Sequence, residues 1–149
     1  PLVGWRGHQQ SFAFIDEYIP GKGMKCYFDG GSSVIQLAMA KFSTDIFMDV
    51  DINAIRKKSL QLIDLFIDLM DKKCSKFLLV TPRDHDKRGS HVSYRCERGL
   101  EIRDYLREKN VHLDFRNPDI LRIAVTPLYT KFVDVWDAVE AISEASEKF

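Results

Sequence analysis

The chain has 149 residues, 45% of them hydrophobic, and its 22 basic and 22 acidic side chains balance to a formal net charge of +0. This size fits one ordinary domain with a real core. A balanced charge gives no long-range attraction to nucleic acid or to an anionic membrane, so we expect neither as a partner. No apolar run is long enough to span a bilayer and the first residues lack a signal-peptide layout, so we expect a cytoplasmic protein. The three cysteines and four histidines show neither CxxC nor HxxxH spacing, which predicts reduced thiols and no metal site.

The first 31 residues carry aromatic residues, glycines and turn signals without a helical or strand period. Large apolar side chains such as Phe12, Phe14 and Tyr18 need a surface to cover them, because exposed apolar patches mark interfaces. The chain also opens with Pro1 and no methionine, which is typical of an interior piece of a longer protein. We therefore expect this segment to be covered by a second copy or by a missing domain, with a homodimer as the natural outcome.

Two helices are predicted next. Ser32 or Ser33 can cap a helix that ends near residue 47, and Asp51 can cap a longer one that ends near residue 73. Apolar residues at three- and four-residue steps form a stripe on the second helix. The basic run 56–58 lies away from this stripe, and we interpret it as a solvated face.

From residue 77 the pattern reads strand, strand, helix, strand, strand, helix, over approximately 77–80, 91–96, 99–109, 111–115, 120–125 and from 131 onward. Asn110 suits the end of the first of these helices. The charged loop 83–89 is either a mobile connection or a ligand site. The order predicts an α/β fold of the α+β kind, a small sheet with helices on one face, preceded by a long linking helix.

Arg122 is the residue of greatest chemical interest. Side chains alternate along a strand, so Leu121 and Ile123 face the core and Arg122 faces the other way. A guanidinium there can clamp a carboxylate through two parallel hydrogen bonds. In that case we expect Arg122 on the sheet face opposite the helices, without a buried carboxylate partner. The alternative is an ion pair with Asp114 or Asp119, or a side chain that reaches into water.

Several motifs occur in the order found near the end of kynureninases, and this resemblance covers essentially the whole chain. They are Gly4-Trp5-Arg6-Gly7-His8, Ile19-Pro20-Gly21, Ile55-Arg56-Lys57-Lys58-Ser59-Leu60, Val80-Thr81-Pro82-Arg83, Lys87-Arg88-Gly89-Ser90-His91-Val92-Ser93, Phe115-Arg116-Asn117-Pro118, Thr126-Pro127-Leu128-Tyr129 and Val135-Trp136-Asp137-Ala138-Val139. The resemblance implies the C-terminal portion of an aminotransferase-like pyridoxal-phosphate fold. Residues 1–50 would form the tail of the large cofactor-binding domain and an interface segment, and residues 51–149 the C-terminal small domain.

The resemblance also implies a function. Kynureninases are homodimeric pyridoxal-phosphate hydrolases that cleave L-kynurenine to anthranilate and L-alanine, in tryptophan catabolism and NAD biosynthesis. The lysine that binds the cofactor covalently lies, in the family, ahead of the position that matches Pro1. We therefore expect no catalytic residue in this chain, no covalently bound cofactor, and no activity of the chain alone.

Carried over residue by residue, the resemblance implies that Arg122 binds the α-carboxylate of the substrate. Trp5 would donate its indole N–H to the cofactor phosphate, although an aromatic packing anchor is the simpler reading of that residue. Backbone N–H groups of Gly31, Ser32 and Ser33 at a helix N-terminus could hold the same phosphate, and a serine hydroxyl could contribute after a small shift. Bacterial relatives carry a Gly-Thr pair where this chain has Gly30-Gly31, so one phosphate-binding hydroxyl is missing.

Two alternatives stay open. The first is a catalytically dead kynureninase-like domain that serves as a binding or dimerisation module, which the missing threonine favours and the retained Trp5 and Arg122 oppose. The second is another pyridoxal-phosphate enzyme, such as a cysteine desulfurase-like or aminotransferase relative. The combination of the Gly4-to-His8 motif with the Thr126-to-Tyr129 motif argues against it.

Overall fold

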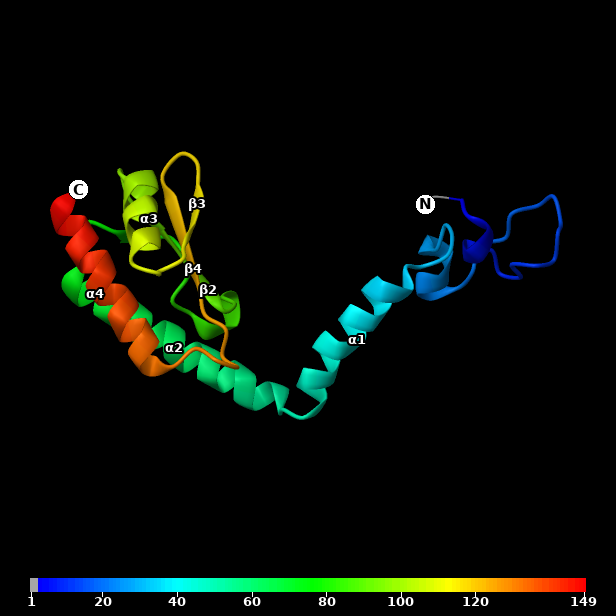
Figure 1. Ribbon diagram of the computed structural model, residues 1–149, viewed down its shortest axis with the longest axis horizontal. Coiled ribbons are helices and arrows are strands. Elements are labelled where there is room, and N and C mark those ends of the chain that lie inside the picture. Colours follow the sequence, from blue (N-terminus) through cyan, green and yellow to red (C-terminus); the bar gives the residue numbers. More distant parts are fainter. Residues whose placement is uncertain (1–2) are drawn as a thin grey trace. The chain divides into compact units, whose positions relative to one another are not determined.

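The computed structural model describes residues 3–149, and the chain divides into two compact units, one that ends at Asp49 and one that spans Val50–Phe149 (Figure 1). In the part of the chain that the structure describes, no helix combines the length and the apolar character needed to cross a membrane.

The first unit contains two short 3-10 helices, η1 (Trp5–Gly7) and η2 (Gly23–Tyr27), and the helix α1 (Val34–Met48). An isolated antiparallel bridge between His8 and Pro20 closes the loop that separates η1 from η2. The side chain of Ser33 caps α1 by accepting the backbone N–H of Gln36 at 3.4 Å. None of the 15 residues of α1, all of which are described, is buried.

The second unit begins with α2 (Ile52–Lys73) and then follows the predicted order of strands and helices. Its other elements are β1 (Leu78–Leu79), η3 (His85–Lys87), β2 (His91–Arg95), α3 (Gly99–Glu108), β3 (Asp114–Arg116), β4 (Ile120–Ala124) and α4 (Phe132–Lys148). The four strands form one antiparallel sheet in the order β1-β2-β4-β3. This confirms the α/β class and the small sheet that the sequence predicts.

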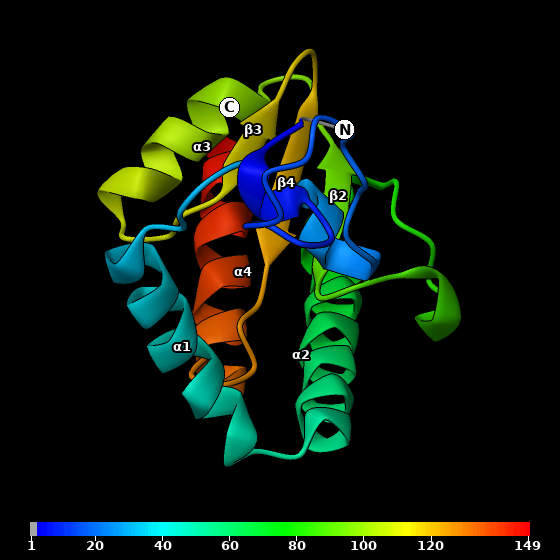
Figure 2. The ribbon, with the colours of Figure 1, turned by 90° about the vertical axis from the view of Figure 1, so that its right-hand side faces the viewer.

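The core lies between one face of this sheet and three helices. Val92 and Tyr94 of β2 and Leu121 and Ile123 of β4 are buried and share a single cluster with residues of α2, α3 and α4. Helices α2 and α4 run side by side (Figures 1 and 2). Phe66 of α2 meets Tyr94 edge-on, with 6.0 Å between the ring centroids. All helices of this unit therefore cover the same face, and the other face stays open.

The ends of the helices follow the predicted chemistry. Asp51 caps α2, because its carboxylate accepts the backbone N–H of Asn53 at 2.9 Å. Asn110 follows α3 with a φ of 60°, the left-handed conformation that asparagine tolerates beyond a helix end. Strand β3 is shorter than predicted and starts at Asp114, since this edge strand pairs only with β4 and only three of its residues find partners there.

The charged loop is attached to α2 and is not a free connection. The Arg88 side chain is 1% exposed and forms an ion pair with Asp64 of α2. Its guanidinium also donates to the carbonyl oxygen of Arg83 at 3.0 Å. His85 places Nε2 3.0 Å from the same Asp64 carboxylate. A buried arginine needs such partners, and they hold the loop in place.

The interpretation of the basic run as a solvated face is wrong for two of its three residues. Arg56 donates to the carbonyl oxygens of His85 and Arg88, at 2.5 Å and 3.0 Å. Lys58 donates to the carbonyl oxygen of Pro127 at 2.6 Å. Long cationic side chains can reach loops beside the helix while the core stripe stays apolar. Both residues therefore fasten loops to α2.

Candidate functional site

The open face of the sheet carries Arg122 at the centre of β4. Its neighbours Leu121 and Ile123 are buried in the core, so the guanidinium leaves the sheet on the face opposite the helices, as expected. The strand register places Arg122 directly between Ser93 of β2 and Asp114 of β3. Its side chain is 41% exposed.

The structure gives Arg122 a carboxylate partner. Its Nη2 donates to Oδ2 of Asp114, and the same oxygen accepts Nε of Arg116 at 3.0 Å. The ion pair with Asp114 is the alternative that the sequence left open, and the register explains it, because residues directly opposite on neighbouring strands have adjacent side chains. Asp114 is 43% exposed, so this partner is not a buried one.

The two arginines also set the charge state of this carboxyl group. Partial desolvation raises the pKa of Asp114, but the hydrogen bond from Arg122 and the charges of Arg116 and Arg122 outweigh it and hold the pKa below its usual range. Asp114 is therefore ionised near neutral pH. Two positive charges and one negative charge meet here, which leaves an excess of one positive charge.

A hollow of about 390 Å³ lies beside Arg122. Its lining residues are His91, His112, Leu113, Asp114, Arg122 and Ala124. Sequence reasoning missed the two histidines as neighbours of Arg122. The available signal was strand register, since His91 pairs with Ala124 and so shares the open face, but a single sequence does not fix which strands pair.

The other predicted site residues lie in the first unit, near a backbone contact between Gly4 and Asp29. A Cβ atom on Gly4 would lie 2.1 Å from Cα of Asp29, so only glycine allows these two backbone segments to touch. Trp5 follows Gly4, and Gly31 and Ser32 follow shortly after Asp29. The backbone contact therefore lies one residue before Trp5 and two residues before Gly31.

Trp5 is 49% exposed. Its ring packs against Phe12, with 5.4 Å between centroids, and against the guanidinium of Arg6 at 5.1 Å. Within the described residues, the indole N–H has no hydrogen-bond partner, so the side chain both packs and keeps a donor available.

The segment ahead of α1 is open. Gly31 and Ser32 are exposed, and a Cβ on Gly31 would meet no atom within 4 Å. The N–H of Gly30 is already taken by Oδ1 of Asp29 at 2.8 Å, and the hydroxyl of Ser33 caps the helix. Across the described part of the chain, the backbone N–H groups of Gly31 and Ser32 have no partner, and neither do those of Ser33, Val34 and Ile35, so several donors are available at this helix N-terminus.

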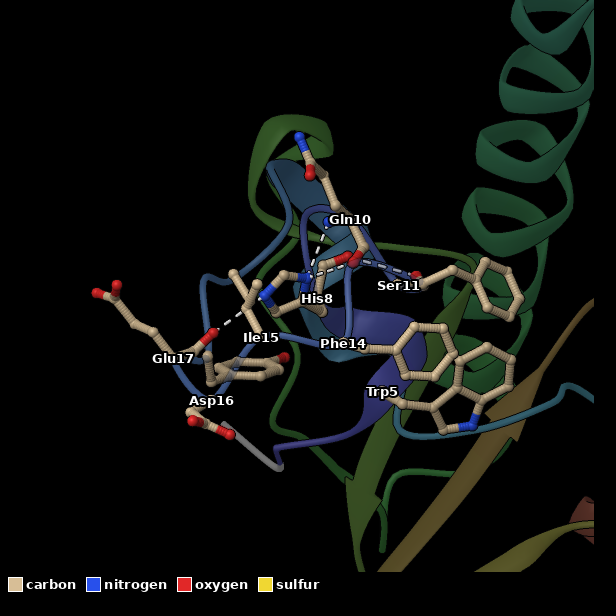
Figure 3. A pocket seen from close by; sticks show the side chains of 10 residues that line it. Trp5, His8, Gln10, Ser11, Phe14, Ile15, Asp16 and Glu17 are labelled. Carbon is tan, nitrogen blue, oxygen red and sulfur yellow. Dashed lines mark hydrogen bonds between the residues drawn. The ribbon is translucent and has the colours of Figure 1, made fainter.

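His8 supports the loop that borders a second hollow of about 570 Å³, which Trp5 and Phe14 line on one side and Asp16 and Glu17 on the other (Figure 3). The His8 ring is 8% exposed. Its Nε2–H donates to the carbonyl oxygen of Glu17 at 3.2 Å, and Nδ1 accepts the N–H of Gln10 at 2.9 Å. Both ring nitrogens form hydrogen bonds to the backbone, so His8 has a structural role in this loop.

A comparison with solved structures defines the class of fold. The crystal structure of 8-amino-7-oxononanoate synthase from Francisella tularensis matches this chain with a TM-score of 0.54 and 25% identity, over 66% of this chain and 29% of that chain. The chain thus has the aminotransferase-like fold that the sequence predicts.

Sequence comparison identifies the family within that class. The profile of the kynureninase C-terminal domain matches residues 55–142. Kynureninase from Pseudomonas fluorescens is 42% identical over 99% of this chain and 36% of that protein. Kynureninase from Burkholderia mallei strain SAVP1 is 41% identical over 97% of this chain and 35% of that protein. The chain belongs to the kynureninase family and spans about a third of the length of these relatives.

Proposed function

We propose that the chain is the C-terminal part of a cytoplasmic kynureninase-type hydrolase that cleaves L-kynurenine to anthranilate and L-alanine with pyridoxal phosphate. Such an enzyme serves tryptophan catabolism and NAD biosynthesis. The observation that carries this proposal is Arg122, a half-exposed arginine at the centre of the open sheet face, beside a hollow of about 390 Å³. The family membership supplies the substrate class.

Arg122 grips the α-carboxylate of the substrate in this proposal. A guanidinium carries five N–H donors, and within the described residues only Nη2 of Arg122 is engaged. The remaining donors can take a second carboxylate in the bidentate geometry that arginine favours. The excess positive charge around Asp114 supports the same ligand chemistry.

Trp5, Gly31 and Ser32 hold the cofactor phosphate in this proposal. Three donors support this proposal: the indole N–H, which has no partner among the described residues, and the two backbone N–H groups ahead of α1. They come from segments whose backbones are in contact nearby, at Gly4 and Asp29. Negative charge is stabilised at such a helix N-terminus. When bound, pyridoxal phosphate withdraws electrons from the bonds of an attached amino acid.

We also propose that residues 1–50 are the tail of the large cofactor-binding domain and that the isolated chain is inactive. Lys25 is engaged in a local contact, since its ammonium group donates to the carbonyl oxygen of Gln9 at 2.9 Å. Incubation of the pure chain with pyridoxal phosphate and L-kynurenine should give no anthranilate fluorescence. Turnover by the chain alone would refute this part.

The carboxylate role is tested by titrating ¹⁵N-labelled chain with L-kynurenine and, as a matched ligand without the carboxylate, with L-kynurenine amide. Loss of charge-assisted hydrogen bonds in Arg122→Gln should weaken L-kynurenine binding about ten- to hundredfold and leave the amide unaffected. Arg95→Gln is the control, since Arg95 lies on the same face and pairs with Asp119. Equal binding by Arg122→Gln and the unmodified chain would refute the role.

The phosphate role is tested through Trp5 fluorescence in a Trp136→Phe background, which leaves one tryptophan. Pyridoxal phosphate and inorganic phosphate should both change the emission. Gly31→Thr restores the hydroxyl of bacterial relatives into open space and should tighten phosphate binding. Because Trp5→Phe removes the fluorophore, phosphate binding by this variant is followed by NMR. If neither Gly31→Thr nor Trp5→Phe changes the affinity for phosphate, the anion binds elsewhere.

A second candidate function is a binding or dimerisation module without catalysis. The observation that favours it is α1, whose large apolar residues are exposed throughout, with Val34, Phe42 and Met48 at 80%, 72% and 82%. Phe12 and Phe14 of the same unit are 72% and 91% exposed. Such a surface needs a cover, and a second copy or the upstream domain would supply it.

A further inference from the structure

One carboxylate on the open sheet face is shared by two arginines. Oδ2 of Asp114 accepts both Nε of Arg116 and Nη2 of Arg122. Asp114 also lines the hollow beside Arg122, directly across the strand register. A ligand carboxylate that docks on Arg122 from this hollow must therefore lie next to a resident carboxylate of the same charge.

The resident pair is suited to exchange. Both side chains are about two-fifths exposed, and exposed ion pairs are held weakly because water and salt screen them. Arg116 is 62% exposed and offers Asp114 a second cation on the same strand. If the bond to Arg122 is given up, the Asp114 carboxylate keeps Arg116 as its partner and is not left unpaired.

We propose that Asp114 is the resident counter-ion of Arg122, which an α-carboxylate ligand displaces toward Arg116. This inference rests on the proposed function and names the residue that sets how tightly Arg122 holds a carboxylate. Asp114 competes with every ligand carboxylate for Arg122 and weakens the binding of each by the same factor. Only a ligand that makes further contacts in the hollow therefore binds well. His91 and His112 line that hollow and are positioned to make those contacts.

The two neighbours of Arg122 should then act in opposite directions. Asp114→Asn removes the competing charge and should tighten L-kynurenine binding about two- to fivefold, the range expected for an exposed ion pair. The affinity for propionate, a carboxylate that makes no further contacts, should rise by the same factor. Arg116→Gln removes the alternative partner of Asp114 and should weaken both ligands. L-kynurenine amide should respond to neither change.

The experiment is NMR titration of the full chain, with Asp119→Asn as the matched control, because Asp119 pairs with Arg95 away from Arg122. Asp114→Glu, which keeps the charge, should bind like the unmodified chain. The inference is overturned if binding depends on Arg122 but Asp114→Asn weakens it or leaves it unchanged, since Asp114 then only positions the arginine. Binding that ignores Arg122→Gln overturns the proposed function itself. If Asp114→Asn does not fold, the Arg116→Gln arm decides alone.

Discussion

Replacing Tyr94 by phenylalanine should stabilise the second unit. Tyr94 is 1% exposed, and among residues 3–149 its hydroxyl has no hydrogen-bond partner. A buried polar group without a partner costs about 1–3 kcal/mol of stability. The substitution removes the hydroxyl and keeps the ring that packs on Phe66. We expect the free energy of unfolding to rise by about 1 kcal/mol, the lower end of that range, because the vacated volume is itself a small loss of packing.

The assay is urea denaturation, followed through the amide NMR signals of Val92 and Leu121, which report on the core of this unit. The slope of the free energy of unfolding against urea concentration should not change, since the same surface is exposed on unfolding. Tyr105→Phe is the control. The Tyr105 hydroxyl donates to Oε1 of Glu144 at 2.6 Å, so its removal should destabilise the unit. If Tyr94→Phe also destabilises, the hydroxyl has a partner and the reasoning fails.

Three further predictions concern pH, backbone contact and assembly. Burial, with the charges of neighbouring acidic groups, raises the pKa of the Cys96 thiol from 9.0 to about 11. Between pH 9 and pH 11 the thiol loses its proton in the unfolded chain but largely keeps it in the folded one. The free energy of unfolding should therefore fall by about 1–3 kcal/mol over this range, and it should depend less on pH in Cys96→Ala. Gly4→Ala should disrupt the NMR spectrum of the first unit, while Gly31→Ala, which meets open space, should leave it intact. Light scattering at micromolar concentration should give about twice the monomer mass, and Phe12→Ser with Phe14→Ser should lower it; a monomer at all concentrations would contradict the interface.

The architecture of the second unit could be predicted because its sequence signals agree with one another. Alternation places Leu121 and Ile123 in the core, and Asp51 and Asn110 mark helix ends by chemistry that acts within a few residues. Such local rules also placed Arg122 on the open face. They do not say which strand lies beside another, so they left the choice between Asp114, Asp119 and water open.

Contacts between distant segments escaped prediction for the same reason. Arg56 and Arg88 look like ordinary surface charges in the sequence, yet Arg88 is buried against Asp64, 24 residues away. The close backbone contact that requires Gly4, where an added Cβ would lie 2.1 Å from Cα of Asp29, also involves a distant residue, and the sequence shows only a glycine in a turn. Side-chain hydrogen bonds across such separations depend on the packed arrangement, which no periodicity encodes.

The missing threonine is the main argument against a working phosphate site, and its weight can be judged from the remaining donors. A neutral hydroxyl contributes about 0.5–1.5 kcal/mol through one hydrogen bond, which is at most about tenfold in affinity. The backbone N–H groups of Gly31 and Ser32 and the indole of Trp5 remain as donors, and the helix N-terminus adds its own favourable field. In the site proposed above, loss of one hydroxyl from such a set should weaken phosphate binding without abolishing it. The departure at Gly31 is therefore compatible with the proposed phosphate site, and the Gly31→Thr titration measures how much affinity the hydroxyl would add.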